Sequence, residues 1–261
     1  MAVVTIALVQ LDVSEKEPVD DRVARALELV AETAADADIV VLPELWHVGA
    51  FDLDGAREHA EPLDGPLVTS LRATALDACT WVHAGSYAER DAEGRTYNTS
   101  LVLGPDGQLA ATYRKIHLFG FDGGEATVMT AGDELVVVDT VCGPTGIATC
   151  YDLRFPELFR GLVDRGALVT LIASGWPSAR ISHWSVLARA RAIENEMVIA
   201  ACNAAGTHAG VTMGGRSVIV DAAGEVLAEA GTGEEVIAAS VDLDEVAAWR
   251  EAFPVLRDRR L

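Results

Sequence analysis

The chain has 261 residues, and 40 acidic side chains against 20 basic ones give it a formal net charge of −20. This charge argues against nucleic acid and anionic membranes as partners, because both bind through Lys and Arg. No stretch approaches the roughly 20 consecutive apolar residues of a membrane span. The four cysteines lack C-x-x-C spacing, so they predict neither a zinc site nor a disulfide framework and favour a reducing cytoplasm.

Strand and helix signals alternate along the chain, which predicts an α/β fold. Residues 3–9 are expected to form a first strand and not a signal peptide, because they lack a basic n-region and a cleavage-site pattern. Further strands are predicted at 39–42, 81–87, 98–103, 135–138, 147–149, 168–172, 198–202, 217–220, 226–228 and 236–241, and helices at 20–35, 66–77, 156–165 and 182–196. No linker interrupts the chain, so we expect a single domain over residues 1–261.

Glu44 follows the apolar run at 39–42, which is typical of a strand buried on both faces. Pro43 cannot donate a ladder hydrogen bond, so the strand is expected to end there. Glu44 then lies at the carboxyl end of a strand, where open α/β sheets place their ligands. A carboxylate that caps a helix is the alternative.

Lys115 is one of only two lysines in a chain that otherwise uses arginine, and it is predicted to lie on a strand that begins after the turn at 105–107. A lysine offers a compact charge with rotatable donors, which suits a small oxyanion or a nearby carboxylate. The alternative is a surface lysine on an edge strand.

Cys150 ends an apolar strand and precedes a sharp turn and a helix that Pro156 opens. Nucleophiles are often presented at such an elbow, and a nearby cation and a helix amino end are expected to favour the thiolate. A buried, inert thiol is the alternative, and it suits Cys79, Cys142 and Cys202 better because they lie in ordinary apolar stretches or loops.

Together, Glu44, Lys115 and Cys150 resemble the catalytic triad of the nitrilase superfamily of carbon–nitrogen hydrolases. The resemblance covers nearly the whole chain, and its motifs are LPE at 42–44, YRKIHLF at 113–119, CYDLRFPE at 150–157 and RARAIEN at 189–195. Each motif is weak alone, but all four occur in order, with spacings of 71 and 35 residues between the three candidates. The second glutamate of the family corresponds to Glu125.

The resemblance implies a four-layer αββα sandwich, in which two mixed β-sheets are flanked by helices. It also implies that subunits pair helix to helix into a homodimer or a higher homo-oligomer. Residues 250–261 would then reach across the dimer interface, and the alternative is an arm that lies on its own subunit.

The resemblance further implies hydrolysis of a small amide through a cysteine thioester, without a metal or an organic cofactor. Cys150 would attack the amide carbon and Glu44 would move the protons. Lys115 and the backbone N–H of Tyr151 would stabilise the oxyanion, and Glu125 would position the substrate nitrogen or tune Glu44. A papain-like Cys–His site is an alternative, although none of the six histidines has that context, and a non-catalytic scaffold is another.

The motif at 150–157, with GWP at 175–177 and SHW at 182–184, looks most like ω-amidases, which hydrolyse 2-oxoglutaramate and 2-oxosuccinamate. The carboxylate of such substrates needs a cation, and Arg154 and Arg180 are the candidates. Trp176 is expected to shape the pocket wall, although it suits the core as well. Short-chain aliphatic amides, N-carbamoyl compounds and nitriles remain alternative substrates.

A structural ion pair is the competing role for one of these arginines. Arg154 lies two residues after Asp152 and three residues before Glu157, so either acid is a candidate partner.

Overall fold

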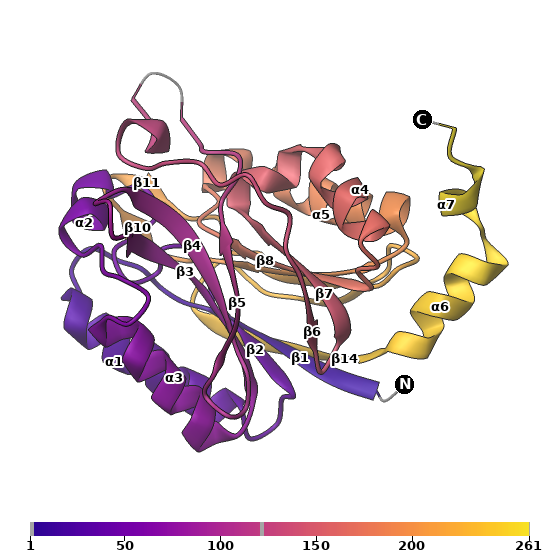
Figure 1. Ribbon diagram of the computed structural model, residues 1–261, viewed down its shortest axis with the longest axis horizontal. Coiled ribbons are helices and arrows are strands. Elements are labelled where there is room, and N and C mark those ends of the chain that lie inside the picture. Colours follow the sequence, from indigo (N-terminus) through magenta and orange to yellow (C-terminus); the bar gives the residue numbers. More distant parts are fainter. Residues whose placement is uncertain (1–2, 121–122, 261) are drawn as a thin grey trace.

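Two six-stranded β-sheets pack face to face, and helices cover the outer face of each sheet (Figure 1). The structure is a computed structural model that describes residues 3–120 and 123–260. The layers follow the order helix, sheet, sheet, helix, as the resemblance implied. Within the described residues, no helix is both long enough and apolar enough to cross a membrane.

The first sheet has the strand order β14-β1-β2-β3-β4-β5. Its strands are β1 Val3–Gln10, β2 Ile39–Val41, β3 Trp81–Arg90, β4 Thr96–Leu103, β5 Leu109–Arg114 and β14 Glu235–Asp242. β1, β2 and β3 are parallel, whereas β4 is antiparallel to both β3 and β5. β2 and β5 therefore run in the same direction, and their carboxyl ends lie at the same edge.

The second sheet has the order β13-β12-β9-β8-β7-β6. Its strands are β6 Val137–Thr140, β7 Gly143–Thr149, β8 Val169–Ser174, β9 Val198–Asn203, β12 Val218–Val220 and β13 Val226–Glu229. β7, β8 and β9 are parallel. A separate two-stranded ribbon consists of β10 Thr207–His208 and β11 Val211–Thr212.

Helices α1 and α3 cover the first sheet, and α4 and α5 cover the second (Figure 1). The helices are α1 Val19–Thr33, α2 Leu53–Glu58, α3 Pro66–Ala78, α4 Pro156–Asp164, α5 Ile181–Asn195, α6 Leu243–Ala252 and α7 Val255–Asp258. Three short 3₁₀ helices, η1 Glu125–Thr127, η2 Cys150–Arg154 and η3 Ser178–Arg180, lie in the loops.

The apolar run before Glu44 is buried on both faces, as its composition predicted. Ile39 and Val41 face the core between the sheets, where they join residues such as Leu171. Val40 points the opposite way, into the core under α1 and α3, because successive side chains of a strand alternate between its faces. β2 is therefore an interior strand, and it holds the residues that follow it in a fixed place.

Several features differ from the sequence prediction. The strands predicted at 81–87 and 98–103 extend to Arg90 and begin at Thr96, so the loop between them spans only 91–95. The helix α6 was not predicted, because only Leu243 and Val246 on it are buried and its apolar periodicity is weak.

The predicted tail at 250–261 begins inside α6 and contacts its own subunit. The Arg250 guanidinium donates to the backbone oxygens of Glu196 and Ala167, and Arg259 pairs with Asp164. The last residue of the tail, Leu261, lies outside the described residues. These contacts agree with the alternative of an arm on its own subunit.

Candidate active site

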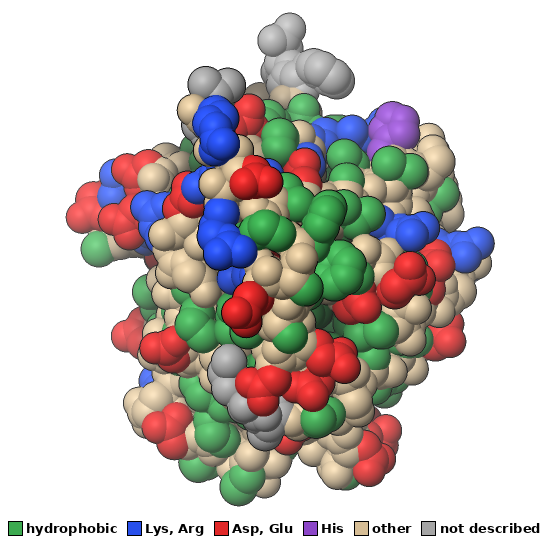
Figure 2. All heavy atoms as spheres, turned by 90° about the vertical axis from the view of Figure 1, so that its right-hand side faces the viewer, with side chains coloured by type: hydrophobic (Ala, Val, Ile, Leu, Met, Phe, Trp, Pro, Cys, Tyr) green, Lys and Arg blue, Asp and Glu red, His purple; other side chains and the backbone are tan. Residues whose placement is uncertain are grey.

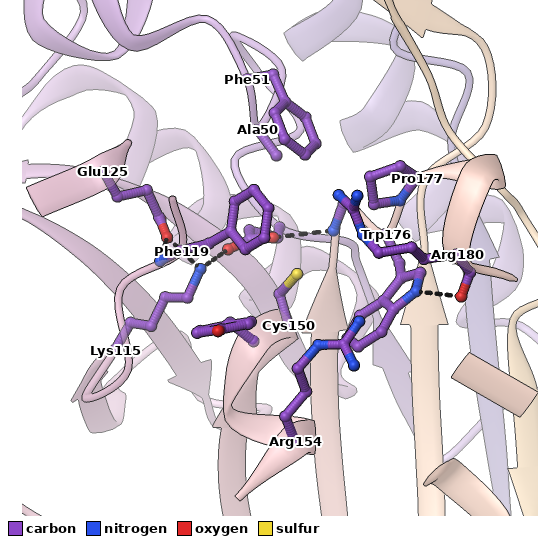
Figure 3. Close-up of a pocket in the computed structure, with 13 residues that line it drawn as sticks. Ala50, Phe51, Lys115, Phe119, Glu125, Cys150, Arg154, Trp176, Pro177 and Arg180 are labelled. Carbon is purple, nitrogen blue, oxygen red and sulfur yellow. Dashed lines mark hydrogen bonds and ion pairs between the residues drawn. The ribbon is translucent and has the colours of Figure 1, made fainter. Parts of the chain in front are cut away.

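Three loops bring the candidate residues together at one edge of the two sheets (Figure 3). Glu44 follows β2 and Lys115 follows β5, both from the first sheet, and Cys150 follows β7 of the second sheet. Because β2 and β5 end at the same edge of the first sheet, residues 71 positions apart along the chain meet as an ion pair.

A bulge in β3 fixes the backbone on which Glu44 sits. Gly85 has a φ of +65°, and a Cβ added there would lie 1.9 Å from the backbone oxygen of Pro43. Only glycine allows this close approach. Ser86 then forms hydrogen bonds with the residues before and after Glu44. Its N–H donates to the Pro43 oxygen at 3.2 Å, and its Oγ accepts from the Leu45 N–H at 3.1 Å.

The Lys115 ammonium is buried between two carboxylates. Its Nζ donates to Glu44 Oε1 at 2.7 Å and to Glu125 Oε2 at 2.6 Å, and the side chain is 1% exposed. Burial acts to lower the pKa of Lys115, but the charges of Glu125 and Glu44 outweigh it and hold that pKa well above its usual value. The alternative of a surface lysine on an edge strand is therefore wrong.

Burial is also the largest influence on the pKa of Glu125, the second carboxyl group beside Lys115. It raises the pKa of Glu125, the Lys115 charge opposes that rise, and Glu44 adds to it. Glu125 is further held by the Phe119 N–H, which donates to its Oε2 at 2.5 Å.

Asn98 is a member of this cluster that the sequence analysis missed. Its Nδ2 donates to Glu44 Oε1 and to Glu125 Oε1, both at 2.9 Å. Its backbone oxygen accepts from the Lys115 N–H at 2.9 Å. A polar residue within the otherwise apolar strand β4 is the signal that could have identified it.

Cys150 stands on a strained elbow between β7 and η2. Its φ of 44° lies in the left-handed region, which is uncommon for a residue with a side chain. Thr149 and Asp152 form a reciprocal capping box across the elbow. Tyr151 is the second residue of η2, where the backbone N–H has no partner inside the helix.

Asp152 ties this elbow to the segment that carries Lys115. One carboxyl oxygen accepts from the Tyr113 hydroxyl at 2.6 Å and from the Thr149 N–H at 2.9 Å. The other accepts from the His117 N–H at 3.0 Å and lies 2.7 Å from its Nδ1. Asp152 therefore anchors both the turn that carries Cys150 and the segment that carries Lys115.

The expectation of a favoured thiolate at Cys150 is wrong for the resting site. Burial and the neighbouring charge of Glu44 raise the pKa of the Cys150 thiol, and they outweigh Lys115. Burial is the largest cause, because it disfavours the charged thiolate, and the Lys115 charge does not offset it. The cysteine therefore rests as a thiol.

A small cavity opens above these groups. Its lining residues are Glu44, Ala50, Phe51, Lys115, Phe119, Glu125, Cys150, Tyr151, Arg154, Gly175, Trp176, Pro177 and Arg180. The sequence analysis missed the contributions of Ala50, Phe51 and Phe119. No histidine is among the described lining residues, so a papain-like Cys–His site lacks supporting geometry.

Glycine is required at one point of the wall. The Gly175 N–H donates to Glu44 Oε2 at 2.9 Å, and a Cβ there would lie 2.4 Å from the Ala50 Cβ.

Two arginines face the mouth of the cavity (Figure 3). The Arg154 guanidinium lies 4.5 Å from the Trp176 ring centroid, and that of Arg180 lies 5.3 Å from the ring centroid of Phe119. Within the described residues, Arg154 forms no ion pair with Asp152 or Glu157, because Asp152 is engaged by Tyr113 and His117. The competing structural role for Arg154 is therefore not supported.

Trp176 serves both roles that its sequence suggested. It lines the cavity, but it is also buried against Trp184, with ring centroids 5.6 Å apart. Its Nε1 donates to the Arg180 backbone oxygen at 2.8 Å, which fixes the segment that carries the second arginine.

Comparison with known proteins agrees with this geometry. The family described as carbon-nitrogen hydrolase matches residues 5–251. The 2-oxoglutaramate amidase of Paenarthrobacter nicotinovorans is 42% identical over 98% of this chain and 89% of its own length. Omega-amidase NIT2 of Homo sapiens is 35% identical over 98% of this chain and 94% of its own length.

A solved structure supports the same conclusion. XC1258 from Xanthomonas campestris, a CN-hydrolase superfamily protein, superposes with a TM-score of 0.92 at 31% identity, covering 100% of this chain and 98% of its own. The chain therefore belongs to the carbon–nitrogen hydrolase family of the nitrilase superfamily and is a hydrolase of carbon–nitrogen bonds other than peptide bonds.

Proposed function

We propose that this protein is an ω-amidase, which releases ammonia from the terminal amide of a small 2-oxo acid such as 2-oxoglutaramate. The observation that carries the proposal is the buried ion pair of 2.7 Å between Lys115 and Glu44, next to the one cysteine among the described lining residues of the cavity. The names of the relatives support the same substrate class.

The first half of the reaction makes a thioester. Cys150 Sγ attacks the amide carbon while Glu44 accepts the thiol proton, because the raised pKa of Cys150 requires a base at that moment. Glu44 then gives the proton to the amide nitrogen, the C–N bond breaks, and ammonia leaves.

The second half of the reaction restores the enzyme. Glu44 takes a proton from a water molecule, which attacks the thioester carbon. The C–S bond breaks, the sulfur regains its proton from Glu44, and the carboxylate product leaves.

Lys115 and the Tyr151 N–H would stabilise the oxyanion of each tetrahedral intermediate. Glu125 would hold Lys115 in place and keep it charged, as their distance of 2.6 Å supports. Glu44, Lys115 and Cys150 are thus the proposed triad, with Glu125 as a fourth member.

Substrate choice would depend on the cavity mouth. A substrate carboxylate must be paired when it is buried, and Arg154 and Arg180 are the cations that line this cavity besides Lys115. Trp176 would form the wall along which the carbon chain lies. Short-chain aliphatic amides, N-carbamoyl compounds and nitriles do not need this pairing, so they stand as alternatives.

Ammonia release from a panel of substrates tests the proposal. We expect kcat/KM for 2-oxoglutaramate to exceed that for butyramide at least about tenfold, the effect of one charge-assisted hydrogen bond. Arg154→Met or Arg180→Met should erase this preference through KM and leave the butyramide rate largely unchanged. Arg57→Met, at an exposed arginine outside the cavity, is the matched control.

Equal use of the two substrates by the wild type would contradict the carboxylate site and favour a general aliphatic amidase. Cys150→Ala should abolish release from every substrate, because it removes the nucleophile. Wild-type turnover by that variant would overturn the thioester mechanism and favour another nucleophile, whereas a wild type that releases ammonia from no substrate would favour a non-catalytic scaffold.

The assembly of the protein is a further part of the proposal. Val186 and Ile193 on α5 are 67% and 50% exposed, which supports a homodimer that pairs helix to helix. We expect sedimentation equilibrium to give a dimer and Val186→Glu to shift it to the monomer. Residues 250–261 would then also contact the partner, and a monomeric wild type would contradict both statements.

Two broader statements complete the proposal. The family match over 5–251 supports a single domain at 1–261. The four cysteines are all free, which supports a reducing cytoplasm as the compartment.

A further inference from the structure

Ser174 carries a buried hydroxyl that the reaction described above does not use. It is the last residue of β8 and is fully buried. Its Oγ has no hydrogen-bond partner among the described residues in the resting site. Leaving a buried hydroxyl unpaired destabilises a fold, so such a group calls for an explanation.

The register of the sheet places this hydroxyl beside the nucleophile. β7 and β8 are parallel, and Thr149 pairs with Ala173. The next residues on the two strands are Cys150 and Ser174, so both side chains emerge at the same edge of the sheet. The Ser174 hydroxyl is near enough to Cys150 to act to lower the pKa of its thiol, against burial and the charge of Glu44, although no hydrogen bond of ordinary geometry joins the two groups at rest.

Ser174 is also next to the group that holds the base. The N–H of the following residue, Gly175, donates to Glu44 Oε2. The end of β8 therefore contacts the base through its backbone and faces the sulfur through a side chain.

We propose that Ser174 is a further catalytic residue, whose Oγ–H donates a hydrogen bond to Cys150 Sγ whenever that sulfur carries negative charge. This happens when the thiol loses its proton to Glu44 and attacks, and again when the C–S bond of the thioester breaks. The proton stays on Oγ throughout, so Ser174 stabilises charge and transfers none. The inference rests on the proposed cysteine mechanism.

The unpaired state of the hydroxyl at rest is part of this role. A neutral thiol is a weak acceptor, whereas a thiolate is a strong one. The hydrogen bond therefore strengthens as the reaction proceeds, and an interaction made mainly in the transition state is the kind that raises kcat.

The test measures the reactivity of Cys150 toward iodoacetamide as a function of pH, with peptide mass spectrometry to separate Cys150 from the exposed Cys79. Only the thiolate reacts. We expect Ser174→Ala to move the pH profile upward and to slow alkylation at a fixed pH at least about tenfold, the effect of one hydrogen bond to a charged group. For the amide substrate, kcat should fall and KM should change little.

Two further variants isolate the hydroxyl. Ser174→Thr and Ser174→Val have nearly the same shape and differ in the hydroxyl group, so the Thr variant should keep the wild-type profile and the Val variant should lose it. Thr170→Val removes another buried hydroxyl of β8, one that donates to Met197 Sδ, and it is the control for a change in the strand itself.

Equal alkylation profiles for the wild type and folded Ser174→Ala, or for the Thr and Val variants, would overturn the inference. Alkylation needs no amide substrate. A wild type that hydrolyses no ω-amide would therefore refute the substrate proposal without deciding the role of Ser174.

Discussion

At the scale of single residues, the main feature is one ammonium shared by two carboxylates. The Lys115 ammonium donates to Glu44 and Glu125, and Asn98 also donates to both acids. Burial and the charge of Glu44 raise the pKa of the Cys150 thiol, so the cysteine stays protonated at rest although a lysine is nearby. In the proposed mechanism, the position of Lys115 therefore matters as much as its charge.

Substitution of Lys115 tests this point. Lys115→Ala should lower kcat at least about 10²–10³-fold, because it removes an oxyanion donor and leaves two buried carboxylates unpaired. Lys115→Arg should not restore activity, since a planar guanidinium cannot occupy the space of an ammonium between two acids. The other lysine, Lys16, is exposed, and Lys16→Arg is the control. Near-normal kcat for Lys115→Arg would show that a positive charge alone suffices.

At the scale of elements, the site depends on how η2 is fixed against β5. Asp152 belongs to η2 and accepts hydrogen bonds from Tyr113 of β5, from His117 after that strand and from Thr149 of β7. This side chain joins the turn that presents Cys150 to the first sheet, so a small change in it can move Cys150 relative to Lys115.

Asp152→Asn is the matching prediction. Both carboxylate oxygens of Asp152 accept hydrogen bonds, and the substitution replaces one of them with an NH₂ group that cannot accept. The donors left without an acceptor cost about 1–3 kcal/mol of stability. We expect a lower midpoint in chemical denaturation and a lower kcat, with KM less affected because the cavity mouth is unchanged. Asp221→Asn, at a distant turn where the carboxylate accepts from Ala223 and Glu225, is the control. Wild-type kcat in Asp152→Asn would mean that other contacts hold the elbow.

At the scale of the whole molecule, stability should depend on pH through two buried histidines. Burial lowers the pKa of His47 to about 3 and that of His83 to about 4. Both are uncharged in the fold, but they gain a proton in the unfolded chain below its ordinary pKa of about 6.5. Their contribution is therefore complete above pH of about 6.5 and is lost as the pH falls toward the folded values.

Denaturation at several pH values checks this prediction. Below pH of about 6, each histidine should lower the free energy of unfolding by about 1.4 kcal/mol for every pH unit that the pH falls. His47→Gln or His83→Gln should reduce that slope by this amount, whatever it does to stability at pH 7, and the exposed His59→Gln is the control. An unchanged slope would show that these histidines are protonated in the fold.

The distribution of charged side chains on the surface is also a property of the whole molecule. Acidic side chains lie dispersed among apolar ones on the face that carries α6 and α7 (Figure 2). Net charge of one sign keeps a protein soluble but gives no information about the fold.

The elements were largely predictable because their signals are local. The apolar run before Pro43 determined β2, and the proline at 156 marked the start of α4. The helix α6 was missed because only two of its apolar residues are buried, so its sequence has little periodicity to detect.

The sequence by itself determined the α/β pattern, the candidates Glu44, Lys115 and Cys150, and the resemblance that joins them, because motif wording and strand ends are properties of short segments. Only the tertiary structure decided that Asn98 holds both carboxylates, that Ser174 lies beside the sulfur and that the resting thiol is protonated. The reason is physical: hydrogen bonds, burial and pKa depend on distances between segments far apart in the chain, and those distances exist only once the strands have paired and the two sheets have packed.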